Sequence, residues 1–97
     1  MKKTLADYTS IIKQMKADAQ QKNWLYIEIN AYELNQEIEP KVSNIKVAAQ
    51  AMLDEMLEGD IFIITPKLKS NLSKDLRLRY YCDNLDPSRK TYKEVMM

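Results

Sequence analysis

The spacing of apolar residues changes along this chain, and the resulting order of helical and alternating segments limits the fold more than any other feature. Apolar positions between Leu5 and Ala19 recur three and four residues apart, which is typical of a helix with one buried stripe. We expect this helix to run from Thr4, as its N-cap, to Lys22. The aromatic and β-branched run Trp24–Ile29 then predicts a short strand.

Two further helices are predicted on either side of Pro40. Asn30 is a capping residue for the first of them, and Pro40 ends it because proline lacks an amide donor. Ser43 is the expected N-cap of the next helix, from about Asn44 to Glu58. Its buried stripe is expected to hold Ile45, Ala48, Ala49, Met52, Leu53 and Met56.

The remainder of the chain predicts a β-hairpin. Gly59 is expected to form the left-handed cap of the preceding helix, and Ile61–Thr65 is β-branched and aromatic. From Asp75 to Cys82 apolar and basic residues alternate, which indicates a strand with one buried and one solvated face. The polar stretch Pro66–Lys74 would form a long basic tip between the two strands.

We therefore expect one domain over residues 1–82 and a tail over 83–97 that is partly ordered or dimer-forming. Turn-forming residues dominate the start of the tail. Trp24 is expected to anchor the core, since large aromatic side chains mostly serve burial. Cys82 is expected to be an inert, partly buried thiol.

Composition argues against an enzyme. The chain has 97 residues with 15 basic and 14 acidic side chains, no histidine, one cysteine and one glycine. Histidine is the commonest metal ligand and neutral-pH base, and a phosphate-binding loop needs several glycines, so we expect no catalytic residue, metal or cofactor. The longest apolar run, Ile61–Ile64, is too short to cross a bilayer, and we expect a cytoplasmic protein.

The near-neutral net charge conceals an asymmetry. Residues 1–60 contain seven basic and ten acidic side chains, a balance of −3, whereas residues 61–97 contain eight and four, a balance of +4. Such a chain can present a cationic face to a polyanion while its total charge stays near zero. A solvated surface of mixed sign is the alternative interpretation.

This order of elements resembles a winged helix-turn-helix domain over Thr4–Cys82. The resemblance rests on the helices Asn30–Glu37 and Ser43–Glu58, their short connection, the turn into Ile61–Pro66 and the return strand Asp75–Cys82. It implies an α+β fold of three helices, with a short strand after the first helix and a C-terminal β-hairpin wing. It also implies that the third helix enters the major groove while the wing contacts the DNA backbone.

Under this resemblance, polar residues near the start of the third helix would read base edges, because asparagine and glutamine suit adenine and lysine suits guanine. The expected base contacts are Ser43, Asn44, Lys46, Val47 and Gln50. The expected contacts to the DNA backbone are Lys41, Lys67, Lys69, Lys74, Arg77 and Arg79.

Each of these residues also has a simpler explanation. Asn44 and Gln50 could be ordinary surface residues, and the lysines of the tip could protect a sheet edge from aggregation. Arg77 and Arg79 could pair with acids across the sheet.

The sequence thus favours a sequence-specific protein for double-stranded DNA, a small bacterial, phage or plasmid transcriptional regulator that acts as a homodimer. The alternative is a winged-helix module that binds a protein partner or inhibits a larger nucleoprotein complex. The near-neutral charge and the acidic residues of the first two-thirds of the chain support that alternative.

Overall fold

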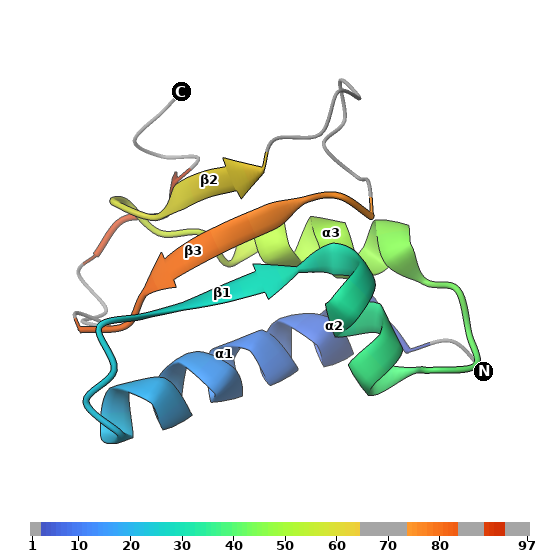
Figure 1. The fold of residues 1–97 in the computed structure, drawn as a ribbon, viewed down its shortest axis with the longest axis horizontal. Coiled ribbons are helices and arrows are strands. Elements are labelled where there is room, and N and C mark those ends of the chain that lie inside the picture. Colours follow the sequence, from blue (N-terminus) through green and yellow to red (C-terminus); the bar gives the residue numbers. More distant parts are fainter. Residues whose placement is uncertain (1–2, 65–73, 84–88, 93–97) are drawn as a thin grey trace.

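A computed structural model describes residues 3–64, 74–83 and 89–92. Within them, three helices pack against a three-stranded antiparallel sheet (Figure 1), which confirms the expected α+β class and the expected order of elements. In chain order, the elements are α1 (Leu5–Gln21), β1 (Tyr26–Asn30), α2 (Ala31–Ile38), α3 (Ile45–Asp54), β2 (Ile61–Ile64) and β3 (Arg77–Tyr81).

The central strand of the sheet is β3. It pairs antiparallel with β2, as the hairpin prediction required, and on its other side with β1, which places Glu28 opposite Arg79. The β2 register shifts between Phe62 and Ile64. Both β1 and β2 are therefore edge strands.

One face of the sheet carries the core. Along β3, Leu78 and Tyr80 are buried, whereas Arg77, Arg79 and Tyr81 are only partly buried and belong to the opposite, outer face. The inner face packs against the apolar stripes of all three helices. The core includes Tyr8, Ile12, Ile29, Leu34, Ala48, Ala49, Met52, Met56, Leu76, Leu78 and Tyr80.

Local capping chemistry places the first two helices as the sequence indicated. The Thr4 hydroxyl accepts a hydrogen bond from the Asp7 amide at 3.2 Å, and the Asp7 carboxylate accepts one from the Thr4 amide at 2.9 Å. The Asn30 side chain accepts a hydrogen bond from the Glu33 amide at 3.0 Å and so caps α2 directly after β1.

The bounds of α3 differ from those expected. The helix has Asn44 as its N-cap in place of Ser43, and it ends at Asp54, four residues before the expected Glu58. Gly59, at φ 91°, is not its C-cap. The chain must reverse here to enter β2, and the Asp60 carboxylate closes that turn by accepting the Leu57 amide at 2.9 Å.

The prediction that Trp24 anchors the core is wrong. Asn23 adopts a left-handed backbone conformation at φ 60°, and the chain leaves α1 so that Trp24 is 53% exposed. The Lys22 ammonium lies 4.9 Å from the centre of its ring. Accordingly β1 begins at Tyr26, two residues later than expected. Cys82 is fully buried, not partly buried as expected.

Residues 89–92, part of the expected tail, pack against the domain. The Arg89 guanidinium donates to the buried Asp60 carboxylate at 2.8 Å and to the carbonyl oxygens of Glu58 and Tyr81. The Tyr92 amide donates to the Met56 carbonyl at 2.9 Å, and its ring contacts Phe62 edge-on. This part of the chain is therefore held to the α3–β2 turn.

A buried polar network joins α1 to the turn between α2 and α3. The Tyr8 hydroxyl donates to the Glu39 carboxylate at 2.6 Å, and the Asn44 side-chain amide donates to the same carboxylate at 3.0 Å. The Asn35 side chain donates to the Tyr8 oxygen and to the Val42 carbonyl, and it accepts from the Asn44 backbone amide at 2.9 Å. The network fixes the path of the turn, because each buried polar group needs its partner.

We expect Tyr8→Phe to lower the free energy of unfolding by about 1–3 kcal/mol, because it leaves the Glu39 carboxylate without one of its buried donors. Tyr32→Phe is the matched control, since Tyr32 is 47% exposed. Urea denaturation measures both. Equal stability of the two variants would contradict the structural role of the network.

The same network predicts a pH dependence. The hydrogen bond from Tyr8 lowers the pKa of Glu39 in the folded state below its ordinary value of 4.5. The charged carboxylate therefore stabilises the folded state above pH 4.5. This stabilisation is lost as the pH falls from 4.5 through the pKa of Glu39 in the folded state. We expect stability to fall less steeply below about pH 4.5 in Glu39→Gln than in the wild type. Urea denaturation across that range, with exposed Glu58→Gln as the control, tests this; identical pH profiles of wild type and Glu39→Gln would contradict it.

Candidate nucleic-acid interface

One side of α3 is open to solvent and carries three of the five predicted base-contact residues, and a fourth, Ser43, lies just before the N-cap. Ser43 and Lys46 are exposed, and Val47 and Gln50 are partly buried. Their spacing of three and four places them along one side of the helix. The other sides are buried through Ala48, Ala49, Ala51 and Met52. The predicted base-contact residues, apart from Asn44, therefore lie next to one another on the solvent side of the helix or just before it.

The expected solvent-facing position of Asn44 is wrong. Its side chain is turned inward and donates to the Lys3 carbonyl at 2.9 Å as well as to Glu39, and the residue is only 7% exposed. An amide bound in this way cannot reach a base edge, and its role is to position the start of α3. Ala51, one turn after Val47, is fully buried.

The exposed side chains of α3 offer distinct chemistry. Lys46 is a donor suited to the acceptors of guanine, and Val47 presents a methyl-bearing surface suited to the thymine methyl group. Gln50 donates to the Asp54 carboxylate at 2.8 Å. It would have to exchange this hydrogen bond for the paired donor and acceptor of adenine.

The start of α3 is open in a way that the other helix starts are not. Asn44 makes no side-chain cap hydrogen bond, and the first turn of α3 contains no acidic residue. By contrast, the first turns of α1 and α2 contain Asp7 and Glu33. A helix N-terminus carries a partial positive charge and unpaired amides that favour phosphate. The one carboxylate seen beside this N-cap is the buried Glu39, which is held by its own donors Tyr8 and Asn44.

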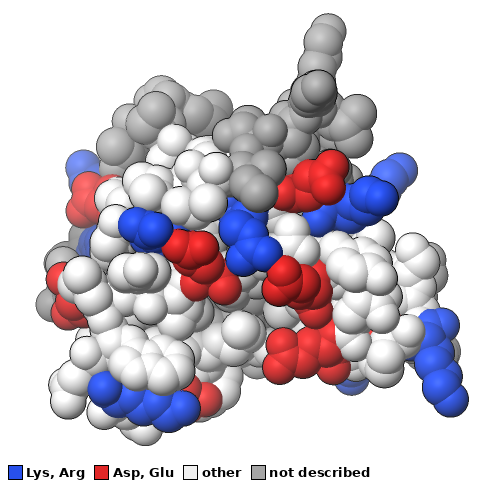
Figure 2. Space-filling view, viewed as in Figure 1, with Lys and Arg blue, Asp and Glu red and all other residues white. Residues whose placement is uncertain are grey.

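The two arginines of β3 are engaged by acids. Arg77 lies 2.6 Å from Glu33, and Arg79 lies 2.8 Å from Glu28 and stacks over the Tyr26 ring at 4.3 Å. The Arg79–Glu28 pair is the pairing across the sheet that the sequence left open as the alternative, whereas the acid that binds Arg77 lies in α2. Figure 2 shows basic and acidic side chains interleaved on this side of the molecule. A phosphate contact here would have to break an existing ion pair, so the structure gives Arg77 and Arg79 no support as backbone contacts.

The exposed lysines are placed differently. Lys41, Lys46 and Lys74 are exposed and form no ion pair with another described residue. The turn before α3 and the start of β3 lie toward the same end of the long axis, at the right in Figure 1. Lys67 and Lys69 fall outside the described residues.

Sequence reasoning missed the residues that hold α3 in place, Tyr8, Asn35 and Glu39. A signal was present for two of them. Tyr8 lies in the apolar stripe of the first helix, and a buried tyrosine needs a partner for its hydroxyl. Glu39 directly precedes Pro40, where a helix must end and a side chain can turn inward.

Comparison with known protein families, with curated proteins and with solved structures found no match. In the part of the chain that the structure describes, no group of acidic or cysteine side chains is placed to hold a metal ion. No helix in that part has both the length and the apolar character needed to cross a membrane.

We expect Asn44→Ala to lower the free energy of unfolding by about 1–3 kcal/mol, because it removes two hydrogen bonds and leaves a buried carboxylate short of a donor. The neighbouring Ser43→Ala serves as the control and should change stability by at most about 0.5 kcal/mol. Thermal or urea denaturation separates the two. If Asn44→Ala were as stable as Ser43→Ala, the positioning role of Asn44 would be refuted.

Proposed function

We propose that this protein binds double-stranded DNA in a sequence-specific manner, with α3 in the major groove, as a small cytoplasmic transcriptional regulator. The observation that carries the proposal is the open start of α3, where the N-cap residue makes no side-chain hydrogen bond. The exposed Ser43 precedes that cap, and the exposed Lys46 and the partly buried Gln50 lie along one side of the helix. The major groove, about 12 Å wide, admits a helix in this orientation.

The distribution of charge favours α3 over the other helices as the one that enters the groove. Lys41 and Lys46 flank its start, and Asp54 lies in its last turn, where a groove-inserted N-terminus would keep it away from the phosphates. Lys74 comes at the start of β3, at the same end of the long axis, and provides a further cation for the DNA backbone. The winged-helix arrangement would add Lys67 and Lys69 to this contact.

A single module of this size covers a short half-site. A homodimer with a two-fold axis would place two copies of α3 in successive major grooves about 34 Å apart and raise the affinity. A protein-interaction role for the same fold is the second candidate. It is favoured by the outer face of the sheet, where ion pairs are balanced and Tyr26, Ile61 and Ile63 are exposed.

Binding to duplex DNA across a salt series tests the proposal. The logarithm of the affinity should fall linearly with the logarithm of the salt concentration, with a slope of about −0.9 for each phosphate neutralised. Lys41→Ala combined with Lys74→Ala should weaken binding to all sequences and make the slope shallower by about 1.8. The pair Lys67→Ala and Lys69→Ala should act in the same direction.

Gln50→Ala should mainly reduce the preference for one or two base pairs and leave the affinity for other sequences nearly unchanged.

Lys90→Ala is the matched control, because Lys90 is exposed beside the α3–β2 turn, away from the start of α3. It should leave the affinity and the slope unchanged. Absent binding at low salt, or binding that does not respond to salt, would refute DNA binding. Equal effects of the Lys41/Lys74 and Lys90 variants would refute the assigned surface.

A further inference from the structure

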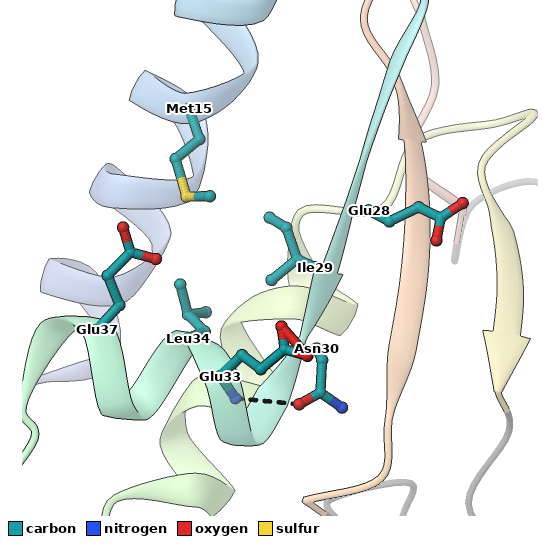
Figure 3. A pocket seen from close by; sticks show the side chains of 7 residues that line it. All are labelled: Met15, Glu28, Ile29, Asn30, Glu33, Leu34 and Glu37. Atoms are coloured by element: carbon teal, nitrogen blue, oxygen red, sulfur yellow. Dashed lines mark hydrogen bonds between the residues drawn. The ribbon is translucent and has the colours of Figure 1, made fainter.

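The free edge of β1 borders a small hollow that the proposed DNA contact does not use. The hollow has an empty volume of about 260 Å³ and lies between α1, α2 and β1. Figure 3 shows Met15, Ile29 and Leu34 around it, with the Glu37 carboxylate at its rim. It therefore has apolar walls and an acidic margin, and no lysine or arginine lines it.

The backbone of β1 is open along this edge. The Leu25 carbonyl accepts from Cys82, and the Ala31 amide donates to the Leu76 carbonyl, so the odd-numbered residues between them also point their backbone groups at β3. In an antiparallel ladder the alternate residues point the other way. Tyr26 and Glu28 therefore direct their amides and carbonyls to the free edge, where another strand can pair. Asn30 can offer only its amide there, because as the N-cap of α2 its carbonyl accepts the first hydrogen bond of that helix.

The rim carboxylates differ in availability. Glu28 points away from the hollow over the sheet, where Arg79 binds it, and Glu33 pairs with Arg77. Glu37 is exposed, and it forms no ion pair with another described residue. It is thus the carboxylate that can receive a cation from outside.

We propose that the free edge of β1 and the hollow beside it bind an extended basic segment of a partner protein, which adds a strand to the sheet and places one lysine or arginine side chain in the hollow. The partner residue opposite Ile29 points to the inner face, where the hollow lies. The methylene stem of its side chain packs on Met15, Ile29 and Leu34, and its charged end reaches Glu37.

The charge of the hollow disfavours a second copy of this chain and duplex DNA as occupants of this edge. A second copy pairing through β1 would bring two acidic rims together, and like charges in such proximity oppose association. Duplex DNA would meet the same carboxylates. A basic strand complements them, and its backbone hydrogen bonds need no particular sequence.

The probe is a short fluorescein-labelled peptide that alternates threonine and valine around one central lysine, and the readout is fluorescence anisotropy. Two comparison peptides carry a central glutamate or N-methyl groups on the amides of one edge. Each should bind about tenfold more weakly than the lysine peptide, because the first reverses the charge and the second blocks strand pairing.

Variants of the protein distinguish binding at the hollow from nonspecific attraction between the charges of the protein and the peptide. Glu37→Gln should weaken the lysine peptide about fivefold or more, and Glu37→Lys should favour the glutamate peptide. Glu58→Gln removes an exposed glutamate that does not line the hollow and should have no effect. The lysine peptide should also slow hydrogen exchange at the Glu28 amide, which points to the free edge, and leave that of Ile29 unchanged.

The proposal is overturned by absent saturable binding, by equal affinity for the lysine and glutamate peptides, or by equal effects of Glu37→Gln and Glu58→Gln. Dimerisation of the protein that competes with the lysine peptide would assign the edge to a second copy and also overturn it. The Lys41 and Lys74 variants should bind the peptide normally. Loss of DNA binding and loss of peptide binding are therefore distinguishable.

Discussion

The hydrogen bonds to the Glu39 carboxylate are the constraint on which the rest of the structure depends. Glu39 lies at the end of α2, yet its partners come from the start of the chain, from α1 and from the N-cap of α3. A buried carboxylate is costly unless it is hydrogen-bonded, so the folded state is stabilised when these partners are brought together. The turn between α2 and α3 is thereby fixed, and the exposed side of α3 with it.

The distribution of charge follows from the same fold. On the outer face of the sheet, Arg77 and Arg79 are matched by acids from α2 and β1. The exposed lysines at the start of α3 have no such match among the described residues, and the charged residues that line the hollow beside β1 are all acidic. A chain of net charge +1 can thus offer a cationic end to DNA and an acidic edge to a basic strand.

Local signals in the sequence predicted the elements of the fold but not all of their surfaces. Capping residues, Pro40 and the alternation of β3 depend on nearby chain chemistry, and they placed α1, α2 and the hairpin. They misplaced both ends of α3, whose N-cap is Asn44 and whose last residue is Asp54. Periodicity also found Ser43, Lys46, Val47 and Gln50 on one side of a helix. It misplaced Asn44, because the inward turn of that side chain depends on a carboxylate and a carbonyl brought to it from α2 and the start of the chain.

The prediction that Trp24 anchors the core was wrong for a similar reason. The Trp24 side chain is exposed because the backbone turns in a left-handed conformation at Asn23 and because of where α1 ends against the sheet. The spacing of apolar residues in the sequence indicates neither of these features. The pairing of Arg79 with Glu28 required the register of β1 against β3, which joins residues 51 positions apart. The pairing of Arg77 with Glu33 required the position of α2 beside the start of β3. Whether a basic residue is available to a partner is therefore decided by tertiary contacts.

The most direct test of the central claim is an NMR titration of the protein with duplex DNA at low salt. The account predicts that the largest shift changes occur at Ser43, Lys46 and Gln50 and at Lys74, with little change at Tyr26 and Arg79 on the outer face of the sheet. Changes concentrated on that outer face, with α3 unaffected, would contradict it.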